Sequence, residues 1–279
     1  MTRTIGVLSH DRHDKIIESA REVVKLIENA GLNARWLPEG PVDQTELELV
    51  VVIGGDGTIL RAVESCYETE VPILGINYGR VGFLAEAEPS GLPDVINSIK
   101  NRDWTVDSRM TVRVQVERRD GSYEESWALN EASIEKGPQA RMIETDIGVD
   151  KRPLSSFKCD TVLVSTPTGS TAYSFSAGGP VVWPNVEAMV LTPVAAHALF
   201  ARPLVVGPES ELTVDMRAED AVVWLDGRRT IDAPEGSRIT VTRGEHRVLL
   251  ARLNDTPFSG RLVRKFNLPV NGWCRGRND

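Results

Sequence analysis

The sequence is short of the features that mark membrane and secreted proteins. It has no run of roughly 18 apolar residues, so we expect no membrane span and no membrane partner. Residues 1–15 lack the long apolar core of a signal peptide. The three cysteines, Cys66, Cys159 and Cys274, stand far apart without a CxxC spacing, which predicts free thiols in a reducing compartment. We therefore expect a cytoplasmic protein.

Basic residues are also scarce relative to acidic ones. The 279 residues include 32 Lys+Arg against 40 Asp+Glu, a formal net charge of -8. Because dedicated nucleic-acid binders are usually basic, we expect no nucleic-acid partner. Hydrophobic residues make up 41% of the chain, which is ordinary for a globular protein, and the length suggests two domains.

Strand and helix signals alternate over the first hundred residues. Short apolar runs predict buried strands, and apolar residues at helical spacing predict the helices between them. This alternation predicts an N-terminal α/β domain with a parallel sheet, which we expect to span residues 1–103. The predicted strands are 4–9, 47–55 and 71–77, and the predicted helices are 14–30, 58–68 and 94–101.

After about residue 104 the pattern changes to the period of β-strands. Alternating segments flank Asp120-Gly121 and Asp226-Gly227, two pairs typical of hairpin turns. Further strand-like runs lie at 160–166, 212–217 and 237–253. We expect this half, residues 104–257, to form a β-rich domain resembling a sandwich.

A glycine-rich loop stands between a predicted strand and a predicted helix. Residues 54–58 read GGDGT, and three glycines in four positions allow a sharp turn and close approach to a ligand. A helix N-terminus after such a loop favours phosphate. Asp56 would repel that phosphate unless it contacts a metal ion or accepts a proton from an attacking hydroxyl. Both roles suit phosphoryl transfer, although a plain strand-end turn explains the same letters.

Two further segments could contact a polar ligand. Residues 165–180 read STPTGSTAYSFSAGGP, which offers many hydroxyls around a Gly-Ser-Thr turn. A polar loop that caps a helix is the alternative. Asn130-Glu131 places an amide beside a carboxylate, a pair able to hold a diol such as ribose, but alone this pair carries little information.

The three segments together, in this order, resemble the signatures of the NAD kinase family. GINYGRVGFLAE at 75–86, PVAAHALFARPL at 193–204 and LDG at 225–227 are also similar to family segments, so the resemblance spans about residues 4–270. It implies an N-terminal α/β domain, a β-rich second domain and a last segment, about 258–279, that returns to the first. It also implies a ligand site between the domains and self-association as a homodimer or homotetramer.

The resemblance implies roles for individual residues. Asp56 matches the proposed general base, close to the metal, and Gly55, Gly57 and Thr58 would line the phosphate loop. Phe83 would pack near the adenine, while Asn130 and Glu131 would hold the riboses of NAD. The other positions that would contact the dinucleotide are Lys158, Asp160, Thr168, Thr171, Ala172 and Tyr173.

The implied activity is transfer of a phosphoryl group from ATP, or from inorganic polyphosphate, to the 2′-hydroxyl of the adenosine ribose of NAD. Mg²⁺ or another divalent cation would be the cofactor. One alternative is a lipid or sugar kinase that shares GGDG. Another is a non-catalytic sensor of NAD, against which the retained carboxylate of Asp56 argues.

Overall fold

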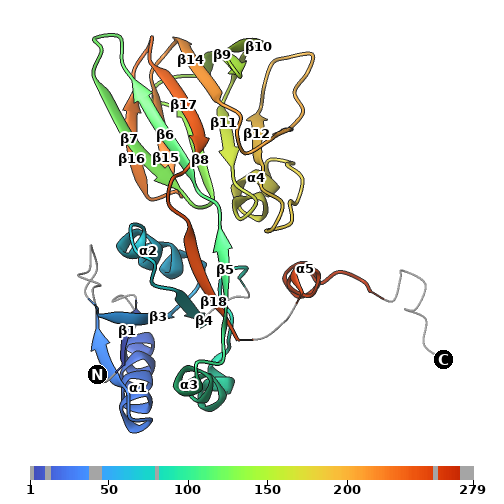
Figure 1. Cartoon of the computed structure of the whole chain (residues 1–279). Helices are drawn as coiled ribbons and strands as arrows, with labels where there is room; N and C mark the ends of the chain where they lie inside the picture. The colour runs from blue at the N-terminus through green and yellow to red at the C-terminus, as the bar shows by residue number, and fades with distance from the viewer. Residues whose placement is uncertain (1–2, 10–13, 38–45, 79–81, 254–256, 271–279) are drawn as a thin grey trace, which may run out of the picture. The chain divides into compact units, whose positions relative to one another are not determined.

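The computed structural model describes residues 3–9, 14–37, 46–78, 82–253 and 257–270. Cys274 lies outside these residues. The chain divides into two compact units, one of residues 1–108 with 248–279 and one of residues 109–247. The first is mixed α/β and the second is built almost entirely of strands, which confirms the expected fold class (Figure 1).

The first unit is built on a six-stranded sheet in the order β2-β1-β3-β4-β18-β5. The pairings of β1 with β2 and β3, of β3 with β4 and of β4 with β18 are parallel. This confirms the parallel sheet predicted from the alternating pattern. The strands are β1 (Thr4–Ser9), β2 (Asn33–Trp36), β3 (Leu47–Ile53), β4 (Ile73–Ile76), β5 (Thr105–Arg109) and β18 (Val248–Arg252).

Helices cover both faces of this sheet. Alternate residues of β3, Leu49 and Val51 among them, share a core with α1 (Asp14–Asn29) and α3 (Leu92–Asn101). The intervening Val50 and Val52 are also fully buried, and α2 (Asp56–Cys66) packs against β3 and β4. Figure 1 shows α2 on the opposite side of the sheet from α1 and α3. The continuous apolar run of β3 is explained by this burial on both faces.

The chain returns to the first unit earlier than expected. The run 237–253 was expected to lie within the β-rich half, but it divides at a turn. Its second part, β18, pairs in parallel with β4 through Leu250 and Ile73. Helix α5 (Phe258–Phe266) follows in the same unit, and a short 3-10 helix (Pro89–Gly91) precedes α3. No helix among the described residues is long and apolar enough to cross a membrane.

A charged network ties β1, β3 and α3 together. The carboxylate of Glu48 on β3 accepts hydrogen bonds from Arg3 at 2.6 and 2.7 Å and from Arg102 at 2.8 and 3.1 Å. Arg3 also donates to the carbonyls of Ile99 and Lys100, which belong to the last turn of α3. These guanidinium groups lower the pKa of Glu48 to about 2.

This network predicts loss of stability in acid. Because the folded pKa lies below the unfolded value of 4.5, Glu48 stabilises the fold above about pH 4.5, and the contribution is lost as the pH falls toward 2. Glu48→Gln should cost about 1–3 kcal/mol at pH 7, after allowance for partial exposure, and clearly less at pH 3. Urea unfolding of both proteins measures this. The exposed Glu28→Gln should change stability by less than about 0.5 kcal/mol, and an equal cost of Glu48→Gln at both pH values would contradict the assignment.

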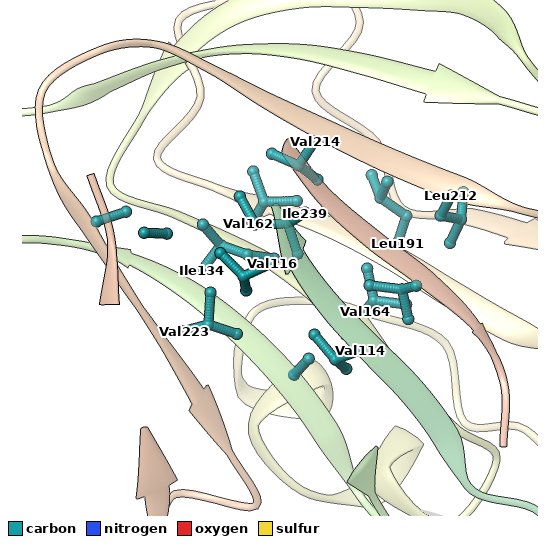
Figure 2. Close-up of a cluster of buried hydrophobic side chains, with 14 of the residues drawn as sticks. Val114, Val116, Ile134, Val162, Val164, Leu191, Leu212, Val214, Val223 and Ile239 are labelled. Atoms are coloured by element: carbon teal, nitrogen blue, oxygen red, sulfur yellow. The ribbon is translucent and has the colours of Figure 1, made fainter. Parts of the chain in front are cut away.

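The second unit is a sandwich of two six-stranded sheets. Their orders are β10-β9-β14-β17-β6-β7 and β13-β12-β11-β8-β15-β16, and the strand pairs in both are antiparallel. The core between them includes Val114 and Val214 from one sheet and Ile134, Val162 and Val223 from the other (Figure 2). The period-2 pattern of β6 and β14 follows from this one-sided burial.

The strands that flank the two turns, and those within 160–166 and 212–217, lie where alternation predicted strands, whereas the strands within 131–159 and 189–206 had not been predicted. Gly121 has a φ of +82°, and Asp226 and Gly227 have φ of +54° and +63°, as hairpin turns require. The strands are β6 (Val112–Glu117), β7 (Tyr123–Ala128), β8 (Glu131–Lys136), β9 (Ile143–Val149), β10 (Arg152–Cys159), β11 (Thr161–Ser165), β12 (Met189–Val194), β13 (Leu204–Val206), β14 (Leu212–Ala218), β15 (Ala221–Leu225), β16 (Arg229–Ala233) and β17 (Arg238–Arg243), with a 3-10 turn (Gly169–Thr171) and α4 (Tyr173–Ser176).

Candidate active site

The GGDGT loop joins β3 to α2 in the first unit. β3 ends at Ile53, and α2 begins at Asp56, two residues earlier than the sequence predicts. A Cβ atom at Gly54 would lie 2.7 Å from Cβ of Thr58, so the loop can close on the helix only with glycine there. At Gly55 and Gly57 a Cβ would meet no described atom within 4 Å. These two positions leave space for a ligand at the start of the helix.

The carboxylate of Asp56 is held by the segment that follows β4. The backbone N–H groups of Phe83 and Leu84 donate to Oδ2 and Oδ1 at 2.9 and 3.1 Å. A Cβ at Gly82 would lie 2.6 Å from Oδ2, so this approach also requires glycine. Asp56 remains half-buried rather than enclosed. The carboxylate therefore has a fixed orientation and lone pairs available for a proton or a cation.

The ring of Phe83 has described neighbours in the C-terminal helix. It lies 5.9 Å from the rings of Phe258 and Phe266 on α5 and is 9% exposed. The resemblance placed this residue near the adenine of the substrate. In the structure its backbone amide holds Asp56, while its ring packs against α5.

In the second unit, the Asn130-Glu131 segment is held by a buried aspartate. The carboxylate of Asp226 accepts from the N–H groups of Asn130 at 2.6 Å and Leu129 at 2.9 Å. The N–H of Asp226 donates to the carbonyl of Glu131 at 3.0 Å. Arg229, which lies 3.2 Å from this carboxylate, stacks over the ring of Trp127. The turn predicted at 226–227 thus also fixes the backbone of the amide–carboxylate pair.

The segment 165–173 lies directly against this pair. Ser165 is paired with Glu131 across β11 and β8, and Thr166 donates from its N–H to the carbonyl of Asn130 at 2.9 Å. A Cβ at Gly169 would overlap the backbone of Asn130, at 2.6 Å from its Cα. The structure therefore brings together two of the three signature segments, and Gly169 is the residue that permits their contact.

Several hydroxyls of this segment donate to backbone carbonyl groups of the protein. Thr166 Oγ1 donates to the carbonyl of Leu129 at 2.5 Å, Ser170 Oγ donates to that of Pro167 at 2.7 Å, and both residues are fully buried. Thr171 Oγ1 donates to the carbonyl of Thr168 at 3.3 Å. Tyr173, at the start of α4, is 39% exposed, and Thr171 and Ala172 are half-buried. Fewer hydroxyls are therefore turned to a ligand than the composition suggested.

Glu131 is 7% exposed, and its Oε2 atom has no hydrogen-bond partner among the described residues. Burial and the nearby carboxylate of Asp226 raise the pKa of Glu131 to about 8, although the N–H of Tyr173 donates to it and opposes the shift. Glu131 is thus largely protonated at neutral pH. A neutral carboxyl group can both donate and accept a hydrogen bond, and the hydroxyls of a diol can serve as its partners in both roles.

Lys158 lies on β10, and Asp160 connects β10 to the start of β11, the end of β11 opposite to Ser165. Thr161, next to Asp160, pairs with Glu135, whereas Ser165 pairs with Glu131. Four residue steps along a strand separate the two ends by about 13 Å. Asp160 accepts from Lys136 Nζ at 2.7 Å, and Lys158 Nζ lies 3.3 Å from Glu144. The structure therefore separates these two residues from Asn130 and Glu131 within the unit.

Sequence reasoning missed a buried cation beside the 165–173 segment. Arg109 is buried, and its Nη1 donates to Thr168 Oγ1 at 3.4 Å, while Thr168 itself is also buried. A lone arginine at the end of a strand carries no local signal of burial. Asp226, which holds the Asn130-Glu131 pair, could have been found in part from the sequence, because it lies in the LDG segment that is similar to a family segment.

The described residues contain no group of three or more His, Cys, Asp or Glu side chains arranged to hold a metal ion. Mg²⁺ usually needs fewer protein ligands than such a group provides. One or two carboxylates, the phosphates of a substrate and water molecules supply its ligands. Asp56 fits this requirement, since each of its oxygens accepts a single hydrogen bond from the backbone.

Comparisons with known proteins identify the family of this chain. The model described as the ATP-NAD kinase N-terminal domain matches residues 36–104, and the ATP-NAD kinase C-terminal domain matches residues 129–253. The chain is 46% identical to NAD kinase 2 of Streptomyces coelicolor, over 97% of this chain and 96% of the relative. It is 45% identical to the NAD kinase of Rhodococcus opacus, over 99% and 96%.

Two solved structures share the fold. The NAD kinase from Archaeoglobus fulgidus in complex with ATP is 29% identical, with a TM-score of 0.77 over 95% of this chain and 100% of that one. Yeast NADH kinase complexed with NADH has a TM-score of 0.87 over 96% and 88%, and at 20% identity it bears on the fold alone. The two family domains together match more than half of the sequence. The chain belongs to the NAD kinase family.

Proposed function

We propose that this protein transfers a phosphoryl group from ATP, or from inorganic polyphosphate, to the 2′-hydroxyl of the adenosine ribose of NAD, giving NADP. The observation that carries the proposal is the carboxylate of Asp56, held by two backbone amides at the first turn of α2 beside open glycines. The family membership supports it, since its relatives are named for this activity.

In the proposed reaction, Asp56 takes the proton of the 2′-hydroxyl as that oxygen attacks the terminal phosphorus of the donor. The bond between this phosphorus and its bridging oxygen breaks, and ADP, or polyphosphate shortened by one unit, leaves. Gly55, Gly57 and Thr58 line the space for the phosphates, which the N-terminus of α2 favours. Mg²⁺ or another divalent cation, held by Asp56 and the donor phosphates, would offset the charge that develops in the transition state.

The second unit would bind the dinucleotide. Asn130 and the neutral carboxyl of Glu131 suit the hydroxyls of a ribose, because both side chains donate and accept. Thr168, Thr171, Ala172 and Tyr173 lie next to this pair and would contact the same ligand. Asp160, next to the far end of β11, would contact the nicotinamide half, and Lys158 on β10 would contact the dinucleotide. Such positioning would supply much of the rate.

We extend the proposal to self-association and to a cytoplasmic location. Leu199, Phe200 and Val205 are large apolar side chains exposed at or next to the edge strand β13, which supports a homodimer or homotetramer. Cys66 and Cys159 are buried thiols, which supports a reducing compartment.

Incubation of the purified chain with NAD, Mg²⁺ and either ATP or polyphosphate tests the proposal. We expect NADP to form with ATP. The reaction with polyphosphate shows whether the donor site also accepts a phosphate chain without a nucleoside. A calorimetric titration with NAD is the companion measurement. Binding of NAD without NADP formation from either donor would favour the sensor, and phosphorylation of a lipid or sugar instead would favour the other kinase class.

A further inference from the structure

We propose that the C-terminal helix α5 is a positioning element for the reaction, with Arg261 as its central residue. The inference rests on the proposed role of Asp56 as general base. It states that α5 fixes the segment 82–86, and that this segment in turn fixes the carboxylate of Asp56. Arg261 would therefore act on the rate without touching either substrate.

The inner side of the segment 82–86 contacts Asp56. Two consecutive N–H groups, those of Phe83 and Leu84, donate to the two oxygens of the carboxylate at 2.9 and 3.1 Å. The absence of a side chain at Gly82 allows this approach. The direction of the Asp56 carboxylate thus depends on two peptide planes of a segment that is neither helix nor strand at this point.

The outer side of the same segment contacts α5 and β18. Arg261 of α5 donates to the carbonyl of Ala85 at 3.0 Å, and Arg252 of β18 donates to that of Leu84 at 3.2 Å. Both guanidinium groups also pair with the carboxylate of Glu86, whose side chain is 1% exposed. The ring of Phe83 packs against two phenylalanines of α5.

These contacts restrict the movement of the segment 82–86, which lies between α5 and Asp56. The N–H of Leu84 bonds Asp56, while the carbonyls of Leu84 and Ala85 bond the two arginines. The peptide unit that carries the Leu84 carbonyl adjoins the unit that carries the Leu84 N–H, and the two planar units meet at the Cα of Leu84. A shift of the carbonyls is therefore transmitted to the N–H groups through the backbone torsions of Leu84 and Ala85. The N–H of Glu86, at 2.8 Å from the carbonyl of Gly75, fixes the end of the segment on β4. Loss of Arg261 would therefore loosen the N–H groups that hold Asp56.

Arg261→Ala in the full-length protein tests the inference. We expect kcat for NADP formation to fall by about 10-fold or more, because small misplacements of a catalytic group are costly. The KM for NAD should change by less than about threefold, since Asn130 and Glu131, which are proposed to hold the riboses of NAD, lie in the other unit. Arg252 still pairs with Glu86 in this variant, so that buried carboxylate keeps a partner and the protein should fold. Arg261→Lys, which keeps the charge but not the two-pronged donor, should recover part of the rate.

Arg264→Ala is the matched control. Arg264 lies on the same helix and pairs with the exposed Glu88 at the surface, so its removal should leave kcat unchanged. Thermal unfolding of each variant is measured alongside. If Arg261→Ala lowers the melting temperature but leaves kcat at 20 °C intact, α5 is merely structural and the inference is overturned. Should Arg261→Ala fail to fold, Phe258→Leu carries the same prediction for kcat and KM.

A double-mutant cycle with Asp56→Asn separates this inference from the proposed function. If α5 acts through Asp56, Arg261→Ala should lower kcat far less in the Asp56→Asn background than in the wild type. A full, independent loss in both backgrounds would overturn the inference while leaving the proposed function standing. If Asp56→Asn itself leaves kcat unchanged, the base role fails, and the inference fails with it.

Discussion

Asp56→Asn is expected to lower kcat for NADP formation by about 10²–10⁴-fold, the range typical of a lost general base. The amide cannot take the proton of the 2′-hydroxyl at neutral pH and offers a cation no negative charge. It also presents only one acceptor to the two N–H groups of Phe83 and Leu84. Steady-state kinetics with NAD and ATP at saturating Mg²⁺ measure the effect.

A second aspartate of the same unit provides the control for this variant. Asp94 lies in the first turn of α3, as Asp56 does in α2, and it is exposed. Asp94→Asn removes the same favourable interaction with a helix N-terminus, worth about 0.3–1 kcal/mol, but no proposed catalytic group. Its kcat should equal that of the wild type. Equal activity of Asp56→Asn and Asp94→Asn would rule out the role assigned to Asp56.

Gly169→Ala should disable the proposed binding site for NAD. The added methyl group would overlap the backbone of Asn130, and a backbone cannot move aside as a flexible side chain can. We expect a loss of stability of about 1–3 kcal/mol from the overlap. We also expect kcat/KM for NAD to fall by about 10²-fold, because displacement of Asn130 misplaces the ribose. Urea unfolding and kinetics at varied NAD concentration measure the two effects.

Gly207→Ala is the matched change elsewhere in the second unit. A Cβ at Gly207 meets no described atom within 4 Å, and Gly207 is not among the glycines with positive φ. Its stability and its kcat/KM should therefore stay close to the wild-type values. If Gly169→Ala behaves like Gly207→Ala, the close contact between the two signature segments has no importance for binding of NAD.

Helices, strands and turns can be predicted from the sequence where a single local pattern is clear. The apolar run of β3, the amphipathic spacing of α1 and the Asp120-Gly121 turn each specify their own structure, and the structure agrees with them. The strand–loop–helix setting of GGDGT was predicted for the same reason. The meeting of the Asn130-Glu131 and 165–173 segments followed from the family resemblance, since neither segment points to the other.

The remaining features depend on long-range contacts that no local pattern encodes. An apolar strand has the same appearance in either unit, so the pairing of β18 with β4 could not be assigned from its residues. Glu86, Arg252 and Arg261 are charged residues that a sequence pattern assigns to the surface, yet they pair with one another and hold backbone carbonyls. The contact of Phe83 with α5 joins segments about 180 residues apart, beyond the reach of periodicity.

A single-turnover measurement tests the central claim, that Asp56 of the GGDGT loop activates the 2′-hydroxyl of NAD. Enzyme in excess over NAD is mixed with ATP and Mg²⁺, and the product is identified by the position of its new phosphate. The account predicts phosphate on the 2′-hydroxyl of the adenosine ribose, formed at least about 10²-fold more slowly by Asp56→Asn than by the wild type. Phosphate at another position, or equal rates for the two proteins, would contradict it.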